Sequence, residues 1–213
     1  MTSRRYGVTV MRRLMTATVA ICLGMAENPG WAAAAAPIDV ITEAVDLLTE
    51  RLDTRNDEFI EDNDALYAFI DGILLPRFDR EFAAGAVLGK HWRTATDEQK
   101  SRFIEAFYIS LVHRYADGLL EFDTDRVEIL PFRGARKRTA TVKTNVRLDD
   151  ATKIPVYYTL VNREDKWRMF NVTIEGVSYI RNYKMEMESQ IRDSGLEKVI
   201  QKLETEVGLG ASE

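Results

Sequence analysis

Few side chains in this sequence are of the types that perform catalysis or bind metal ions. His91 and His113 are the only candidate bases, and Cys22 is the single cysteine. The apolar spacing places His113 on the polar side of a predicted helix and His91 near a helix boundary, so both are interpreted as surface or hydrogen-bonded residues. The sequence has no His-x-x-x-His pair, glycine-rich phosphate loop or Gly-x-Ser-x-Gly motif. It therefore predicts a protein that is not an enzyme and holds no metal ion or cofactor.

Charged residues gather at two places in the chain. The acidic stretch 57–64 lacks the spacing of a calcium-binding EF-hand loop and is interpreted as the solvated start of a helix. One basic cluster occurs in a chain whose net charge is −5, and it consists of Arg133, Arg136, Lys137 and Arg138. This cluster is either a solvated hairpin turn or a contact for an anionic partner surface or a lipid phosphate. The acidic balance of the chain argues against binding to nucleic acid.

The N-terminal residues 1–36 have the pattern of a cleaved secretory signal peptide. Four arginines precede a short apolar stretch, Leu14–Met25, and small residues follow it. We expect cleavage near Ala34–Ala36, which removes Cys22 and leaves a more acidic chain without cysteine. A chain without free thiols suits an oxidising compartment, so we expect the chain to be secreted.

Six segments carry apolar residues at helical spacing. The first spans about 38–54, and the second follows Asp64 and ends near Pro76. The third is short, at 82–88. The longest spans 97–122, and Thr96 with Gln99 forms a capping box at its start. Two closing segments follow at about 178–193 and 195–207.

Between these helical segments the apolar pattern changes to a period of two. The alternation predicts about four strands, around 127–129, 140–148, 154–160 and 167–174. Short connections between them indicate an antiparallel meander. We therefore expect an α+β fold in which N- and C-terminal helices wrap a twisted sheet, formed by a single domain at 37–207 with a flexible tail at 208–213.

The long helix at 97–122 has a broad apolar face that can cover the sheet. A sheet and helices of this kind can pack as a solid core or enclose an apolar cavity. The residues alone leave both possibilities open.

Several motifs together resemble the MlaC family, also called the toluene-tolerance auxiliary family. The segments that carry the resemblance lie in the expected order at Leu88–Thr96, Ile154–Leu160, Trp167–Val172 and Ile174–Ser178, with Tyr183 just after them. The resemblance covers roughly residues 38–205. One departure is Asn171, where many members carry aspartate.

The resemblance implies a soluble periplasmic carrier that moves phospholipid between the outer and inner membranes. Its implied partners are an inner-membrane ABC transporter with an MCE-domain subunit and an outer-membrane lipoprotein–porin complex. The implied fold holds acyl chains between a twisted antiparallel sheet and helices. We expect a monomer. The alternative is a binding protein for another apolar ligand, such as a sterol, hopanoid or quinone.

The residues expected to line the acyl chains lie on faces of the helices and sheet that should meet. From the helices they are Ile73, Leu74, Val87, Phe107, Leu111, Tyr115 and Leu119. From the sheet they are Val142, Val146, Val156, Tyr158, Leu160, Trp167 and Met169. Trp92 and Tyr183 are interpreted as structural residues.

Overall fold

A computed structural model describes residues 35–120, 127–148 and 151–210, without the side chains of residue 53 and residues 117–119. The predicted signal peptide falls almost entirely on residues 1–34, which lie outside the described residues. From Ala34 onward the chain forms one unit. The helices of its first half are α1 (Pro37–Glu61), α2 (Asn63–Leu74), α3 (Arg80–Leu88), the 3-10 helix η1 (Gly89–Arg93) and α4 (Asp97–Leu120).

The acidic stretch belongs mostly to the end of α1 and not to the start of the next helix. α1 continues past the predicted end, with a kink at Arg55, because Phe59 is fully buried and anchors the last turns. Asp62 then caps α2 by accepting hydrogen bonds from the backbone amides of Asp64 and Ala65.

The capping box predicted for α4 is confirmed. The Gln99 amide donates to Thr96 Oγ1 at 3.1 Å, and the Gln99 side-chain oxygen accepts from the Thr96 amide at 3.1 Å. These two bonds satisfy backbone donors that the first turn of a helix leaves free, and so fix where α4 begins.

The sheet is an antiparallel meander in the order β1-β2-β3-β4-β5. Its strands are β1 (Val127–Ile129), β2 (Thr139–Arg147), β3 (Lys153–Arg163), β4 (Lys166–Ile174) and β5 (Val177–Ser178). The α+β prediction is confirmed, although we predicted about four strands and missed β5, whose two residues are too few to show a period. The pairing of β3 with β4 shifts register between Thr159 and Leu160.

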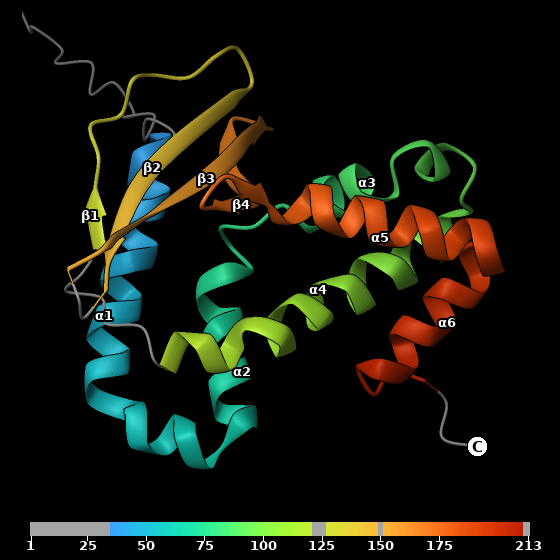
Figure 1. The fold of residues 1–213 in the computed structure, drawn as a ribbon, viewed down its shortest axis with the longest axis horizontal. Coiled ribbons are helices and arrows are strands. Elements are labelled where there is room, and N and C mark those ends of the chain that lie inside the picture. The colour runs from blue at the N-terminus through green and yellow to red at the C-terminus, as the bar shows by residue number, and fades with distance from the viewer. Residues whose placement is uncertain (1–34, 121–126, 149–150, 211–213) are drawn as a thin grey trace, which may run out of the picture. The chain divides into compact units, whose positions relative to one another are not determined.

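Two helices, α5 (Tyr179–Ser194) and α6 (Leu196–Glu206), close the chain. The sharp turn between them requires Gly195, whose φ of +85° favours glycine. α5 packs on α3, and α6 packs on α4. Figure 1 shows α5 and α6 extending beside α3 and α4, away from β1 and β2.

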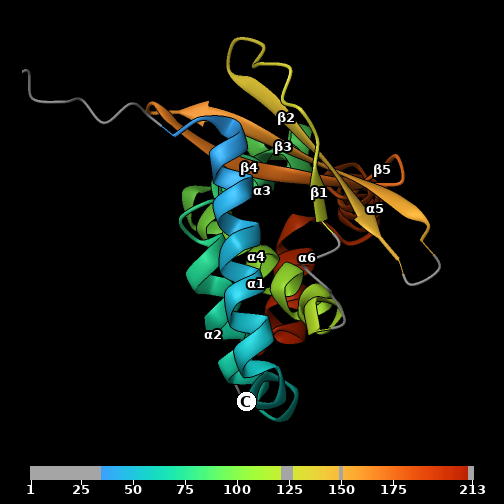
Figure 2. The ribbon, with the colours of Figure 1, turned by 90° about the vertical axis from the view of Figure 1, so that its left-hand side faces the viewer.

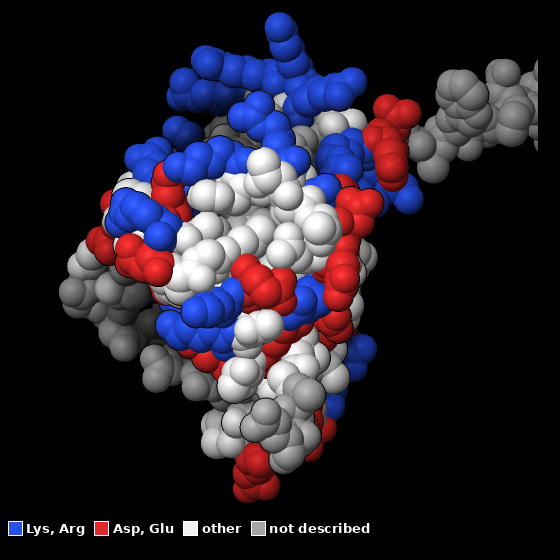
Figure 3. Space-filling model, turned by 90° about the vertical axis from the view of Figure 1, so that its right-hand side faces the viewer, with Lys and Arg blue, Asp and Glu red and all other residues white. Residues whose placement is uncertain are grey.

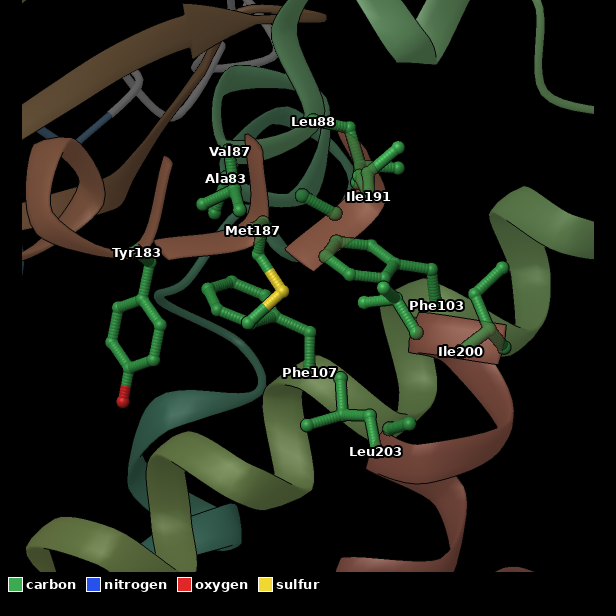
Figure 4. Packing of buried hydrophobic residues seen from close by; sticks show 13 residues of the cluster. Ala83, Val87, Leu88, Phe103, Phe107, Tyr183, Met187, Ile191, Ile200 and Leu203 are labelled. Carbon is green, nitrogen blue, oxygen red and sulfur yellow. The ribbon is translucent and has the colours of Figure 1, made fainter. Parts of the chain in front are cut away.

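Three clusters of buried side chains hold these elements together. The largest joins α3 and the first half of α4 to α5 and α6, and includes Phe103, Phe107 and Met187 (Figure 4). A second joins α1, α2 and α4 around Phe59 and Leu66.

The third cluster joins the sheet to the first turns of α1. Val40 and Ile41 pack there against Val142 and Leu160. Figure 2 shows α1 running across the sheet in front of β3 and β4 and continuing alongside α2. None of the described helices is long and apolar enough to cross a membrane.

Candidate functional site

A cavity of about 430 Å³ lies between the sheet and the helices, where the three clusters approach one another. Its size falls within the ~300–1,000 Å³ of typical ligand sites. The solid-core alternative is therefore excluded for this part of the molecule.

Three helices form one side of the cavity. α1 contributes Ile41, Ala44, Val45 and Leu48, and α2 contributes Ile70, Ile73 and Leu74. The second half of α4 contributes Tyr108, Leu111, Val112, Tyr115 and Ala116. These positions recur three or four residues apart, so each helix turns one apolar stripe toward the cavity.

The sheet and the start of α5 form the other side. The strand residues are Val146, Val156, Tyr158, Met169, Phe170, Asn171, Val172 and Ile174, and α5 adds Tyr179, Ile180 and Tyr183. Met169 and Phe170 are neighbours and both reach the cavity, because the register shift between β3 and β4 leaves Phe170 without a partner on β3.

Two polar side chains in this wall have hydrogen-bond partners within the protein. The Tyr108 hydroxyl donates to Asp71 at 2.7 Å, and burial together with this carboxylate raises the pKa of Tyr108. Asn171 Oδ1 accepts from Ser178 Oγ at 3.0 Å and from the Ile180 amide at 3.2 Å. A carboxylate could accept the same two bonds, so the change from aspartate preserves them.

The cavity approaches solvent beside Tyr115. This side chain is 37% exposed, and every other lining residue is buried or half-buried. The Tyr115 ring meets the Tyr179 ring edge to face, with 5.0 Å between centroids. We therefore place the opening of the cavity next to these two rings.

The structure brings eight of the predicted lining residues together around the cavity: Ile73, Leu74, Leu111, Tyr115, Val146, Val156, Tyr158 and Met169. It places others in the solid clusters. Val87 and Phe107 pack against α5 and α6, whereas Val142, Leu160 and Trp167 pack in the cluster under the start of α1. The side chain of Leu119 lies outside the described part of the chain.

Helix geometry explains why Phe107 and Tyr115 point to different places. Residues four apart are rotated by about 40° on a helix with 3.6 residues per turn, so two such steps turn the side chain by about 80°. Phe107 consequently faces α5 and α6, whereas Tyr115 faces the cavity.

Sequence reasoning missed the contribution of α1 and of Tyr183. The spacing of Ile41, Val45 and Leu48 predicted a helix with one apolar face, but gave no indication of which surface that face covers. Tyr183, interpreted above as structural, has its ring in the large cluster and also lines the cavity.

The basic cluster lies in the loop between β1 and β2, and all four of its side chains are exposed. This loop ends where β2 begins, at Thr139. Val146, which lines the cavity, lies seven residues further along β2, so at ~3.3 Å per residue it is about 23 Å from Thr139. In Figure 3, Lys and Arg side chains gather at the top, the level at which Figure 1 shows this loop. Figure 1 also shows α4, which carries Tyr115, well below this loop, so the cluster lies away from the opening beside Tyr115.

The histidines do not join the cavity wall. His113 is exposed and stacks on Tyr67 with 4.3 Å between ring centroids. Within residues 35–120, 127–148 and 151–210, no group of three or more histidine, cysteine, aspartate or glutamate side chains is arranged to hold a metal ion.

These features define an α+β protein with an internal apolar cavity. The chain belongs to the MlaC protein family, whose family model matches residues 42–205. It is 28% identical over 171 residues to the toluene tolerance protein ttg2D of Pseudomonas putida, a match that covers 79% of this chain and 80% of the relative. It is 19% identical over 200 residues to the intermembrane phospholipid transport system binding protein MlaC of Haemophilus influenzae, covering 92% and 90%.

A solved structure has the same fold. It is the phospholipid-binding protein from Ralstonia solanacearum in complex with a phospholipid, with a TM-score of 0.72 and 21% sequence identity. The match covers 82% of this chain and 98% of that protein.

Proposed function

We propose that this chain binds a phospholipid by its acyl chains and carries it through the periplasm between outer-membrane and inner-membrane transport complexes. The observation that carries the proposal is the apolar cavity of about 430 Å³ between sheet and helices. Membership of the MlaC family and the names of the relatives support a phospholipid as the ligand.

The cavity provides enough apolar burial to hold a lipid away from water. If a methylene fills the ~30 Å³ that a water molecule occupies, the cavity holds about fourteen methylenes. At ~0.8 kcal/mol for each buried methylene, their transfer contributes about 11 kcal/mol before the costs of binding. No directional chemistry is needed for this contribution, which agrees with the apolar character of the wall.

Transfer between vesicles tests the carrier proposal. Donor vesicles contain a self-quenched fluorescent phospholipid, and acceptor vesicles contain none. We expect the chain lacking residues 1–36 to accelerate dequenching in proportion to its concentration. A rate equal to that with protein-free buffer or with heat-unfolded protein would refute carriage.

For partners we propose an ABC transporter with an MCE-domain subunit in the inner membrane and a lipoprotein–porin complex in the outer membrane. The basic cluster formed by Arg133, Arg136, Lys137 and Arg138 is the proposed contact. It is exposed and lies away from the cavity opening, so it can bind an acidic partner surface without blocking lipid exit.

Charge-matched variants test this contact. Replacing all four basic residues by alanine should weaken docking to the MCE-domain subunit, most strongly at low salt, and leave lipid content unchanged. The matched control replaces four exposed cations on α5 and α6: Arg181, Lys184, Arg192 and Lys198. Equal docking by the two variants would identify the cluster as a solvated turn.

A further inference from the structure

One hydroxyl in the cavity wall lacks a hydrogen-bond partner. Tyr183 is 4% exposed, and within residues 35–120, 127–148 and 151–210 no atom meets hydrogen-bond geometry with its Oη. Buried hydroxyls in folded proteins almost always have partners, because an unpartnered one destabilises the fold. A ligand in the cavity can supply the missing acceptor.

The Tyr183 hydroxyl lies at the end of the cavity that reaches solvent. Figure 4 shows its ring beside Phe107, with the oxygen pointing away from the other labelled side chains of the cluster. The Tyr115 hydroxyl is a polar neighbour, and burial together with Tyr183 raises the pKa of Tyr115. Two phenol hydroxyls carry two protons, and a bond between them uses one, so this pair always retains a donor for a third group.

Two other polar side chains of the wall already have partners, and the remaining phenols are those of Tyr158 and Tyr179. Tyr108 already donates to Asp71, and the Asn171 side chain is bonded to Ser178 and Thr173. The lining residues from α1 and α2 are all aliphatic. A ligand with an apolar tail and a polar acceptor at one end can therefore place its acceptor at Tyr115 and Tyr183, where the buried hydroxyl lacks a partner.

We propose that the Tyr115–Tyr183 hydroxyl pair donates a hydrogen bond to an ester carbonyl oxygen of the bound glycerolipid. The proposal rests on phospholipid as the ligand and adds where its glycerol end lies. An ester carbonyl is the first acceptor after the acyl chain and marks the boundary between tail and headgroup. Tyrosine, which has an apolar ring and a polar tip, favours such boundaries.

Two lipids that differ only at this group test the proposal. One is a diester phosphatidylglycerol, and the other is its diether analogue with the same headgroup and chain length, in which the carbonyls are replaced by methylenes. Competition against a fluorescent lipid gives both dissociation constants. We expect wild-type protein to bind the diester about three- to tenfold more tightly, the range for one net hydrogen bond.

Tyrosine-to-phenylalanine variants locate the donor. In Tyr183→Phe alone the Tyr115 hydroxyl keeps a proton to donate, so Tyr115→Phe/Tyr183→Phe, which removes both hydroxyls, should bind the diester more weakly and show a reduced or absent preference for it. Tyr108→Phe, the matched control in the same wall, should keep the wild-type diester preference because Asp71 occupies that hydroxyl. Thermal melting should give Tyr183→Phe a midpoint equal to or above that of wild type, since no protein hydrogen bond is lost, and Tyr108→Phe a lower one.

The outcomes separate this proposal from the proposed function. Equal affinity of wild-type protein for diester and diether, or a full preference retained by Tyr115→Phe/Tyr183→Phe, overturns the ester contact and leaves phospholipid binding standing. Failure of wild-type protein to bind either lipid overturns phospholipid binding itself. The comparison on wild-type protein requires no variant to fold.

Discussion

Filling the cavity with a protein side chain should displace lipid without unfolding the protein. Ala44 lines the cavity from α1, and Ala44→Trp adds an indole there. A cavity of ~150 Å³ accommodates a benzene ring, so the indole takes at least about 150 Å³, or about a third of the 430 Å³. This volume corresponds to about five methylenes at ~30 Å³ each. At ~0.8 kcal/mol each, the loss is about 4 kcal/mol, or about a thousandfold in affinity.

The assay combines lipid content with stability. Purified protein is extracted with organic solvent, and phospholipid is quantified per chain. Competition binding gives the dissociation constant, and urea unfolding gives the free energy of unfolding. Ala44→Trp should lose most of its lipid yet unfold at nearly the wild-type urea concentration, because the ring occupies existing space. Ala68→Trp is the matched control, since Ala68 is exposed on α2, and it should keep its lipid.

Two results would refute this reasoning. If Ala44→Trp retains a full complement of lipid at wild-type affinity, the ligand does not occupy this part of the cavity. If Ala44→Trp loses several kcal/mol of stability, the space around Ala44 is packed in solution.

Three further predictions concern the parts of the fold that hold the cavity in place. Val142→Trp should destabilise the protein by about 1–3 kcal/mol in urea unfolding, because Val142 is fully buried in a solid cluster. If the variant is as stable as wild type, the cavity reaches this site. Arg102 lowers the pKa of Glu204 by a charge-assisted hydrogen bond. This bond stabilises the folded state fully above pH 4.5, the ordinary pKa of Glu204, and its contribution to stability is lost as the pH falls through the lower pKa of the folded state. Arg102→Met should therefore flatten the acid side of a stability-against-pH curve, and an unchanged curve would contradict the assignment. Asp79 caps α3 through the Phe82 amide, so Asp79→Ala should cost about 1–2 kcal/mol in urea unfolding, and a loss below about 0.3 kcal/mol would show that the cap contributes little.

Local patterns in the sequence predict the elements of this fold well. The start of α4 follows from its capping box, which specifies two hydrogen bonds between residues three apart. The strands β2 and β3 follow from strict alternation, since residues two apart share a face. The extension of α1 to Glu61 was missed, because Phe59 and Ile60 are the only apolar residues in the acidic stretch 57–64, and the burial of Phe59 depends on α2 and α4.

The lining of the cavity depends on contacts between distant segments, and no local pattern contains them. Val142 and Val146 share one face of β2, yet the first turns of α1 cover Val142 while Val146 borders the cavity. Phe170 enters the wall through a register shift that depends on the pairing of β3 with β4. Tyr183 combines a buried ring with an unpartnered hydroxyl, and only the three-dimensional arrangement shows that both occur at the cavity opening.

Native mass spectrometry of the protein tests most directly whether the cavity holds a phospholipid. The chain lacking residues 1–36 is produced in a bacterial periplasm, purified without detergent and measured under non-denaturing conditions. The account predicts a major species heavier than the bare chain by the mass of one diacyl phospholipid, which fragments to release that lipid and is depleted in Ala44→Trp. A bare chain alone, even after incubation with phospholipid vesicles, or an adduct with the mass of a sterol, hopanoid or quinone, would contradict it.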